Sequence, residues 1–459
     1  MQWDNVLSGA IQQVTLRQTP ATGEALSFPY TTFQTIHFIN PARNVKLRGI
    51  SYFCELRMPK ISDKGRMMPA SPIRKLAPFA ERAKKNNVHI YHLNIGQPDI
   101  ETPPQFWEAI RRIDRKVLEY SPSDGYEELR KKYAHFFQSR YQLDSLLPED
   151  ILITTGASEA LMFTLFSILD SGDEIIIPEP LYANYIGFSK SGNINVRPIP
   201  TTFENGFKLP SIDEFEKVIN EKTKAILICN PNNPTGYAYS DEELHRLKDI
   251  VLKHDLFLLS DEVYRDFIYD NDTAYTSIFS FPEIAQNAIL IDSISKRFSA
   301  CGARIGMVAT KNKEVLQTVL KFAQQRLSPP TVEQLGTIAM FDVEWDYFAK
   351  GNSEYKKRRD ILVEGLNKIE GVKCHVPGGA FYCIVQLPVA DTDAFCQWML
   401  SDFTYQGATV MMAPASGFYA TEGMGKNEVR IAYVLNGDEL KKAIECLAQG
   451  LQTYRELQG

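Results

Sequence analysis

Short apolar runs alternate with helical segments between about residues 150 and 335. The helical segments include 158–169 and 241–254, and the second follows Ser240 with Glu243 three residues later, the arrangement of a capping box. Such alternation is typical of a sheet covered by helices on both faces. The sequence therefore predicts a large α/β domain. Its predicted strands are 151–154, 174–177, 195–199, 225–229, 257–259, 288–291 and 307–309.

The pattern changes after about residue 335, where long charged helices at 354–369 and from 437 onward accompany strands at 379–387 and 428–435. The first amphipathic helix pattern lies in the segment around residues 58–105. We expect that segment to pack with the C-terminal part, because a chain that leaves and re-enters a domain often closes a cleft between the two units. The predicted division is an N-terminal arm and part of a small domain at 58–105, a large domain at 106–334 and a small α+β domain at 335–459.

Residues 1–57 have no sustained helical or strand period and are rich in Thr and Gln. We interpret them as an appended segment that is disordered or not translated, with translation starting at Met58, Met67 or Met68. The alternative is a genuine extension that packs on a partner subunit.

Composition narrows the classes of function. The 44% apolar and 23% charged residues are ordinary for a soluble globular protein, and a formal net charge of −6 gives no general basic surface for nucleic acid. We therefore expect small molecules and a second copy of the chain as partners. The seven cysteines form no C-x-x-C pair, which favours reduced thiols and a cytoplasmic location. No stretch resembles a membrane span or a signal peptide, and the seven dispersed histidines predict no metal site.

Candidate chemistry lies where predicted strands end, because ligands of open α/β sheets collect at the carboxyl ends of the strands. Ala157 and Ser158 follow one strand and open a helix, which suits a phosphate, although a plain turn is the alternative. Asn233 lies in a loop of turn-forming residues after another strand. Asp261, with Tyr264 three residues later, follows a third strand. An acidic residue there is usually a helix cap or a surface group, whereas a buried carboxylate would need a cationic partner.

The segment around Lys296 is the strongest candidate for a ligand-binding site. Lys296 stands in the segment LIDSISKRFSACGARIG, just after a strand, with Ser293 and Ser295 before it and Arg304 eight residues after it. A lone lysine in a loop is ordinarily a solvated group. The two hydroxyls and the arginine near Lys296 instead suit an amine that is desolvated beside a bound phosphate. The guanidinium of Arg304 would bind the phosphate oxygens bidentately.

An ordered set of motifs resembles the class I/II pyridoxal-phosphate-dependent aminotransferases of fold type I, the aspartate aminotransferase superfamily. The motifs are LNIGQPDIETP, YSPSDGY, TTGASEAL, PNNPTG, SDEVY, SISKRFSACGARIG and VRIAYVL, and the resemblance covers about residues 60–455. It implies a mostly parallel seven-stranded sheet between helices, a smaller α+β domain formed by the N- and C-terminal segments, and pyridoxal 5′-phosphate as cofactor.

The resemblance also implies roles around the cofactor ring. Lys296 would carry the cofactor as a Schiff base and then shuttle the proton of the substrate. Asp261 would keep the pyridine nitrogen protonated, and Asn233 and Tyr264 would bond the phenolic oxygen. Tyr182 would stack on the ring, in a position where many relatives have tryptophan, although an interface aromatic is the alternative reading.

Further roles are implied for the phosphate and the substrate. Ala157, Ser158, Ser293 and Arg304 would hold the phosphate, and Tyr120 would reach it from the other subunit, which implies a homodimer with shared sites. For the substrate, the implied ligands of the α-carboxylate are Arg430, Asn233 and the backbone at Gly96.

The side chain of the substrate is less well defined. Arg326 lies in the region where aspartate-specific relatives place a second basic residue but not at the matching position, and an exposed helix-terminal arginine is the alternative. Aspartate with 2-oxoglutarate, reacting by a ping-pong Schiff-base mechanism, is the leading pair, and aromatic, alanine or prephenate substrates remain open.

A carbon–sulfur lyase or an aminocyclopropane-carboxylate synthase of the same fold would use the same lysine, aspartate and arginines. A non-catalytic ligand-sensing domain would need a DNA-binding region, and residues 1–57 lack a helix-turn-helix pattern. A nicotinamide site at Gly423-x-Gly425 fails, since Glu428 replaces the third glycine and no strand precedes it.

Overall fold

The computed structural model describes residues 46–47, 50–51, 59–269 and 275–458. The chain divides into two units, Met1–Lys60 and Ile61–Gly459. In the first unit the structure describes two short strands that pair in antiparallel fashion, β1 (Lys46–Leu47) and β2 (Ile50–Ser51). Most of the segment predicted to be disordered or untranslated lies outside the described residues, and that interpretation stays a prediction.

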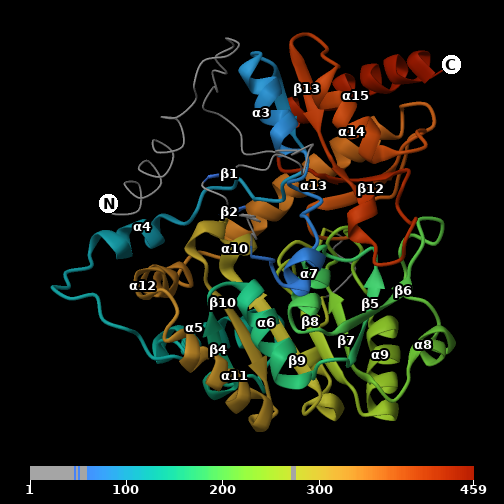
Figure 1. The fold of residues 1–459 in the computed structure, drawn as a ribbon. Coiled ribbons are helices and arrows are strands. Elements are labelled where there is room, and N and C mark those ends of the chain that lie inside the picture. The colour runs from blue at the N-terminus through green and yellow to red at the C-terminus, as the bar shows by residue number, and fades with distance from the viewer. Residues whose placement is uncertain (1–45, 48–49, 52–58, 270–274, 459) are drawn as a thin grey trace. The chain divides into compact units, whose positions relative to one another are not determined.

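A seven-stranded sheet forms the centre of the large α/β part of the second unit (Figure 1). Its strand order is β4-β10-β9-β8-β7-β5-β6, and β10 runs antiparallel to both of its neighbours while the other pairs are parallel. The prediction of a mostly parallel seven-stranded sheet is confirmed, with strands that extend at most two residues beyond the predicted ends. They are β4 (Ile151–Thr154), β5 (Glu174–Glu179), β6 (Asn195–Pro200), β7 (Thr223–Cys229), β8 (Phe257–Asp261), β9 (Ala288–Ser293) and β10 (Gly306–Thr310).

The central strands are largely apolar because both faces of the sheet are covered, whereas the edge strand β6 exposes Asn195 and Arg197. Ile151 and Ile153 of β4 belong to one hydrophobic core, while Leu152 between them belongs to the other. Helices α6 (Ala157–Ile168) and α11 (Lys313–Arg326) pack in the core that contains Leu152. Helices α5 (Glu127–Tyr141), α9 (Asp241–His254) and α12 (Thr331–Met340) pack in the core on the opposite face. The predicted capping box is present at α9, where Ser240 and Glu243 bond each other's backbone N–H groups.

Most helices of this part lie between successive strands of the sheet along the chain. Their bounds are α4 (Pro104–Arg111), α5 (Glu127–Tyr141), α6 (Ala157–Ile168), α7 (Asn184–Ser191), α8 (Ile212–Val218), α9 (Asp241–His254), α10 (Ile294–Arg297), α11 (Lys313–Arg326) and α12 (Thr331–Met340).

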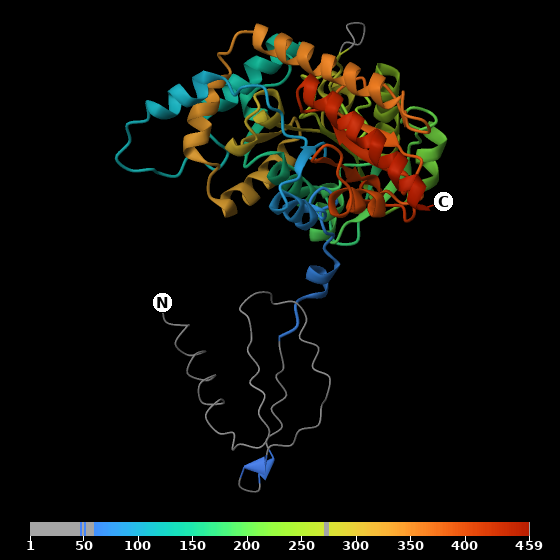
Figure 2. The ribbon, with the colours of Figure 1, turned by 90° about the horizontal axis from the view of Figure 1, so that it is seen from above.

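A smaller antiparallel sheet lies in the C-terminal part, in the order β11 (Lys373–Cys374), β12 (Tyr382–Gln386), β15 (Glu428–Ala432) and β14 (Ala413–Pro414). The long helices α13 (Asp346–Leu366) and α15 (Gly437–Gln458) pack side by side next to it (Figure 2). Helix α14 (Thr392–Ser401) completes this α+β part.

The N-terminal arm joins this C-terminal part, as predicted. Strand β3 (His89–His92) pairs in parallel with β13 (Ala408–Met411), and α3 (Ala77–Lys85) packs on α14. A short helix, α2 (Asp63–Met67), precedes them. The proposed domain boundaries after residues 105 and 334 stay predictions.

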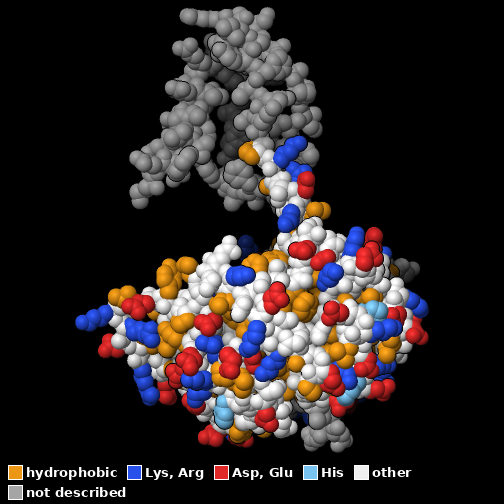
Figure 3. All heavy atoms as spheres, turned by 90° about the horizontal axis from the view of Figure 1, so that it is seen from below, with side chains coloured by type: hydrophobic (Ala, Val, Ile, Leu, Met, Phe, Trp, Pro, Cys, Tyr) orange, Lys and Arg blue, Asp and Glu red, His pale blue; other side chains and the backbone are white. Residues whose placement is uncertain are grey.

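The surface in Figure 3 carries acidic and basic side chains interspersed over one face, without a broad area of either sign. Among the helices that the structure describes, none combines the length and the apolar character needed to cross a membrane. The six described cysteines are free thiols, and the cytoplasmic location stays a prediction.

Candidate active site

A cavity of about 580 Å³ lies at the carboxyl ends of the central strands, where they face the smaller sheet. Segments far apart in the sequence line it, because strand ends of the large sheet, the N-terminal arm and strands β12 and β15 meet there. Ten of the twelve predicted site residues are among the lining residues, namely Gly96, Ala157, Ser158, Tyr182, Asn233, Asp261, Ser293, Lys296, Arg304 and Arg430.

One end of the cavity is formed by the N-terminus of α6. Gly156 precedes the helix with φ +77°, and no side chain caps the free N–H groups there. A Cβ atom on Gly156 would lie 2.3 Å from Nη2 of Arg304, so the close approach of this arginine requires glycine. Nearby, the hydroxyls of Ser293 and Ser295 are 2.8 Å apart. Helix N–H groups, a guanidinium and hydroxyls make a site suited to a phosphate.

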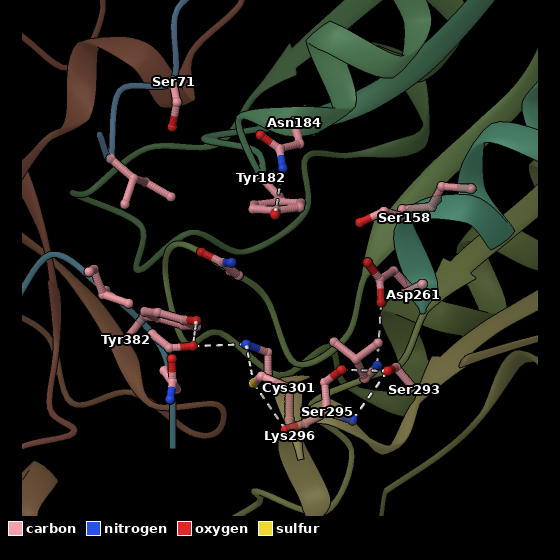
Figure 4. A pocket seen from close by; sticks show the side chains of 18 of the residues that line it. Ser71, Ser158, Tyr182, Asn184, Asp261, Ser293, Ser295, Lys296, Cys301 and Tyr382 are labelled. Atoms are coloured by element: carbon pink, nitrogen blue, oxygen red, sulfur yellow. Dashed lines mark hydrogen bonds between the residues drawn. The ribbon is translucent and has the colours of Figure 1, made fainter. Parts of the chain in front are cut away.

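Lys296 lies in α10, and its ammonium donates a hydrogen bond to the carbonyl oxygen of Gly96 at 2.8 Å. The hydroxyl of Tyr382 donates to the same oxygen at 3.3 Å (Figure 4). The Cys301 thiol lies 3.9 Å from the amine. Tyr182 lies across the cavity from Lys296, and its hydroxyl accepts a hydrogen bond from Asn184 at 2.7 Å. The amine therefore faces the cavity with space between it and an aromatic ring.

Asp261 is the last residue of β8 and is 4% exposed. The hydroxyl of Tyr185 donates to its carboxylate at 2.7 Å, yet no ion pair with Lys or Arg forms in the part of the chain that the structure describes. Burial raises the pKa of this carboxyl from 3.8 to about 6, and the Tyr185 hydrogen bond offsets only part of that rise. A buried carboxylate at a cavity wall without a cation is suited to a cationic ligand group.

A chain of hydrogen bonds crosses the opposite wall. The amide of Asn233 donates to the Tyr264 hydroxyl at 3.4 Å, and that hydroxyl lies 2.9 Å from the hydroxyl of Tyr382. Tyr264 is buried behind the lining residues, so Asn233 is the member that reaches the cavity directly. Burial raises the pKa of Tyr264 well above its ordinary value, which keeps the phenol protonated as a hydrogen-bond donor.

Arg430, on β15, is 1% exposed and lies over the ring of Tyr382, with 4.6 Å between guanidinium and ring centre. One Nη donates to Oδ1 of Asn233 at 3.1 Å and the other to the carbonyl of Asn94. Its Nε has no hydrogen-bond partner, and no described carboxylate pairs with the group. Burial lowers the pKa of Arg430 from its ordinary value. A buried guanidinium without an anion is poised for a carboxylate ligand.

Comparison with known proteins agrees with this geometry. A family model described as aminotransferase class I and II matches residues 88–447. The chain is 31% identical to an aspartate aminotransferase of Pyrococcus horikoshii, over 87% of this chain and 99% of that protein. It is also 31% identical to aromatic-amino-acid aminotransferase 2 of Thermococcus litoralis, over 85% and 98% respectively. A solved structure of the Thermus thermophilus aspartate aminotransferase with maleate superposes with a TM-score of 0.78 at 28% identity, covering 86% of this chain and all of that one.

The chain belongs to the class I and II aminotransferase family. Class I and II aminotransferases use pyridoxal phosphate, and the donor set of the cavity fits that group. An uncapped helix N-terminus beside Arg304 suits its phosphate, and the unpaired carboxylate of Asp261 suits its protonated ring nitrogen. The amine of Lys296 suits its aldehyde.

Two residues considered for this aminotransferase site lie elsewhere. Tyr120 is 78% exposed and does not line the cavity of its own chain, and its assignment to a partner's site stays a prediction. Arg326 does not line it either. The alternative of an exposed arginine is wrong, because Arg326 is largely buried at the end of α11, where it pairs with Glu159 and donates to the carbonyl of Ser123. Arg326 thereby supports the turn before α6.

Several lining residues of the aminotransferase cavity were not predicted, among them Ser71, Arg74, Gln97, Asn184, Cys301 and Tyr382. A sequence signal existed for Tyr382. In the register of β12 and β15, Ile384 pairs with Arg430, and two residues along the strand Tyr382 shares the face of Ile384. Pairing the two C-terminal strand patterns would therefore have placed Tyr382 beside the arginine.

Proposed function

We propose that this aminotransferase moves the amino group of aspartate to 2-oxoglutarate in two half-reactions that share one cavity. The observation that carries the proposal is the set of Lys296, unpaired Asp261 and unpaired Arg430 around a single cavity. It gives an amine, an anion and a cation, each with a matching group on the cofactor or on an amino acid.

Lys296 is the proposed anchor of the cofactor and the proposed catalytic base. When bound, pyridoxal phosphate supplies an electron-withdrawing ring that stabilises negative charge on the carbon that bears the amino group. Lys296 would hold the cofactor through Nζ, and with substrate bound the same Nζ would move the proton between the substrate's Cα and the cofactor's C4′ carbon. The carbonyl of Gly96, 2.8 Å from Nζ, orients the amine for this task.

The remaining residues bind and orient. Asp261 would pair with the protonated ring nitrogen, and Asn233, backed by Tyr264, would donate a hydrogen bond to the phenolic oxygen. Arg430 binds the α-carboxylate, assisted by Asn233, which already bonds the guanidinium. Both charges are buried, so the pairs they form act at low dielectric and hold the reacting carbon in one place.

The phosphate is the proposed ligand of Ala157, Ser158, Ser293 and Arg304. We propose that Tyr120 completes this site from the partner subunit of a homodimer. The segment between α4 and α5 extends outward from the body in Figures 1 and 2. It exposes Val117, Leu118 and Tyr120, with 66%, 65% and 78% of each residue accessible, and apolar exposure of this kind marks a surface that a second chain covers.

Aspartate is the proposed donor because relatives named for aspartate align over nearly their full length. The aromatic relative is as similar, so the test must separate the two. A panel of aspartate, glutamate, alanine, phenylalanine and cysteine is mixed with holoenzyme, and the cofactor absorbance is followed in each half-reaction. Aspartate and glutamate are expected to convert the cofactor to its amine form fastest, with return on adding 2-oxoglutarate.

Other outcomes of the panel assign other functions. Faster conversion by phenylalanine or alanine would replace aspartate while leaving transamination intact. Release of pyruvate and ammonia from cysteine would indicate a carbon–sulfur lyase. If none of the amino acids changed the absorbance, transamination itself would be wrong.

A further inference from the structure

Tyr382 lines the cavity but has no role in the proposed function. It is the first residue of β12 and is 2% exposed. Its ring lies against the guanidinium of Arg430, while its hydroxyl lies between the hydroxyl of Tyr264 and the carbonyl of Gly96. The ring and the hydroxyl of one side chain thus contact two different parts of the site.

The ring of Tyr382 is one of two aromatic rings that pack against Arg430. The guanidinium carbon lies 4.6 Å from the ring centre of Tyr382 and 4.9 Å from that of Phe418. Phe418 is fully buried and does not line the cavity, so Tyr382 supplies the ring on the cavity side. An aromatic face attracts a desolvated cation and fixes the plane of a guanidinium that stacks on it. A bidentate bond to a carboxylate depends on that plane.

The hydroxyl of Tyr382 belongs to a chain of hydrogen bonds that begins at Asn233. The amide of Asn233 donates to the Tyr264 hydroxyl at 3.4 Å, and the hydroxyls of Tyr264 and Tyr382 are 2.9 Å apart. Because the Tyr382 hydroxyl donates its single proton to the carbonyl of Gly96 at 3.3 Å, Tyr264 is the donor in the bond between the two tyrosines. All these bonds therefore point towards the Gly96 carbonyl, an arrangement in which each bond polarises the next.

The carbonyl of Gly96 also accepts a hydrogen bond from the amine of Lys296, at 2.8 Å (Figure 4). A carbonyl oxygen has two lone pairs, so both bonds form at once. The backbone approaches Tyr382 this closely because residue 96 is glycine, since a Cβ atom there would overlap the phenol. Loss of the Tyr382 hydroxyl would leave this carbonyl free to turn, and the amine of Lys296 would lose its fixed acceptor.

We infer that Tyr382 is a positioning residue with two separable effects. Its ring holds the guanidinium of Arg430 in the orientation that binds a carboxylate, and its hydroxyl holds the carbonyl that orients the amine of Lys296. The inference rests on the proposed function and adds a residue to it. Substitutions at this one position should therefore differ, because Tyr382→Phe removes only the hydroxyl, whereas Tyr382→Leu and Tyr382→Met also remove the aromatic ring.

The test compares these three variants with Tyr433→Phe. Tyr433 directly follows β15 in the same small sheet, and its buried hydroxyl donates to the carbonyl of Ala380 at 3.2 Å without lining the cavity. It therefore controls for the loss of a buried tyrosine hydroxyl. Calorimetry gives the Kd of holoenzyme for butyrate, a ligand with one carboxylate. Absorbance gives the rate at which apoenzyme takes up added pyridoxal phosphate, and the maximal half-reaction rate with aspartate.

Tyr382→Phe is expected to lower both rates by about 3- to 10-fold, the effect of one neutral hydrogen bond, and to change the Kd for butyrate by less than about twofold. Tyr382→Leu and Tyr382→Met should show the same losses of rate and also weaken butyrate binding by about 3- to 30-fold, the range of a desolvated cation–π contact. Met fills irregular space in a core, so at least one variant without the ring should stay folded. Tyr433→Phe should match the wild type in all three measurements.

Other results would overturn the inference. Wild-type rates in Tyr382→Phe would exclude the effect of the hydroxyl, and wild-type butyrate binding in the variants without the ring would exclude the effect of the ring. Equal losses in Tyr433→Phe would show a general disturbance of the small sheet and no specific role for Tyr382. If no amino acid reacts with the wild type, the proposed function fails, while butyrate binding and cofactor uptake still decide the inference.

Discussion

Two groups of buried charges lie near Lys296, and they differ in whether their members form ion pairs. One is a charge network formed by Glu262, Arg265, Asp266, Asp292 and Arg297. Its ion pairs measure 2.7 Å for Arg265–Glu262 and Arg297–Asp292 and 3.0 Å for Arg297–Asp266. The other group is Asp261 and Arg430 in the cavity, which are as deeply buried and form no ion pair among the described residues.

The charges of the network stabilise the fold through ion pairs, whereas the two cavity charges are available to bind a ligand. Burial alone would raise the pKa of Asp266, but Arg297 and Arg140 outweigh it and hold the pKa below its ordinary value. Asp261 has no such partner, and burial raises its pKa to about 6. Burial also raises the pKa of Asp292 to about 6 despite its ion pair with Arg297, so the missing ion pair, and not the pKa, sets Asp261 apart from the network. Burying an unpaired charge costs stability, so its persistence at a cavity wall indicates that a ligand offsets the cost.

The largest expected effect comes from breaking the network. Arg297→Met leaves Asp292 and Asp266 buried without their shared cation, and should lower the free energy of unfolding by about 3–5 kcal/mol. Arg140→Met is the matched control, because its side chain is 24% exposed and Asp266 keeps Arg297, so its loss should be about 1 kcal/mol. Denaturant titration measures both. An Arg297→Met protein that is as stable as Arg140→Met, yet inactive, would contradict the distinction between the network and the cavity charges.

The reverse pattern is expected for Arg430. Arg430→Gln removes an unpaired charge, so stability should stay within about 1 kcal/mol of the wild type or rise. Half-reaction efficiency should fall about 100-fold for every amino acid, because each carries an α-carboxylate. Stopped-flow absorbance gives the rates. Unchanged half-reaction rates together with a large loss of stability would show that Arg430 stabilises the fold, as the charge network does, and does not bind the substrate.

A smaller, pH-dependent effect is expected at Asp261 in the protein without cofactor. The folded pKa, about 6, lies above the ordinary 3.8, so the folded state binds this proton more tightly than the unfolded state. Stability from Asp261 is therefore present below about pH 4 and is lost as pH rises through 6, by about 2–3 kcal/mol. Melting temperatures of wild type and Asp261→Asn should diverge between about pH 4 and 6, with the melting temperature of the wild type falling relative to that of the variant. Parallel curves would contradict the raised pKa.

The sequence could predict the cavity walls that belong to the large sheet. Its strands are buried on both faces and read as apolar runs, and the polar residues that follow them must meet at one edge. That reasoning placed Ser158, Asn233, Asp261 and Lys296 together, and the motif order added Arg430.

Residues supplied by packing between distant segments could not be predicted in this way. Arg74 lies beside another basic residue in an amphipathic pattern, and nothing local distinguishes the one that lines the cavity from Lys75, which pairs with Asp393. The charge network was missed for a related reason. Arg297 and Asp266 are separated in sequence, and each alone reads as a surface charge until the fold brings them to 3.0 Å.

The most direct test of the account asks where the cofactor is attached. Holoenzyme is reduced with borohydride, digested, and the cofactor-bearing peptide is identified by mass spectrometry, with Lys296→Ala treated in parallel. A reduced adduct is expected on Lys296 in the wild type and none in the variant, whose turnover should fall by at least about 10²–10⁴-fold. An adduct on another lysine, or one that forms at full yield in Lys296→Ala, would contradict it.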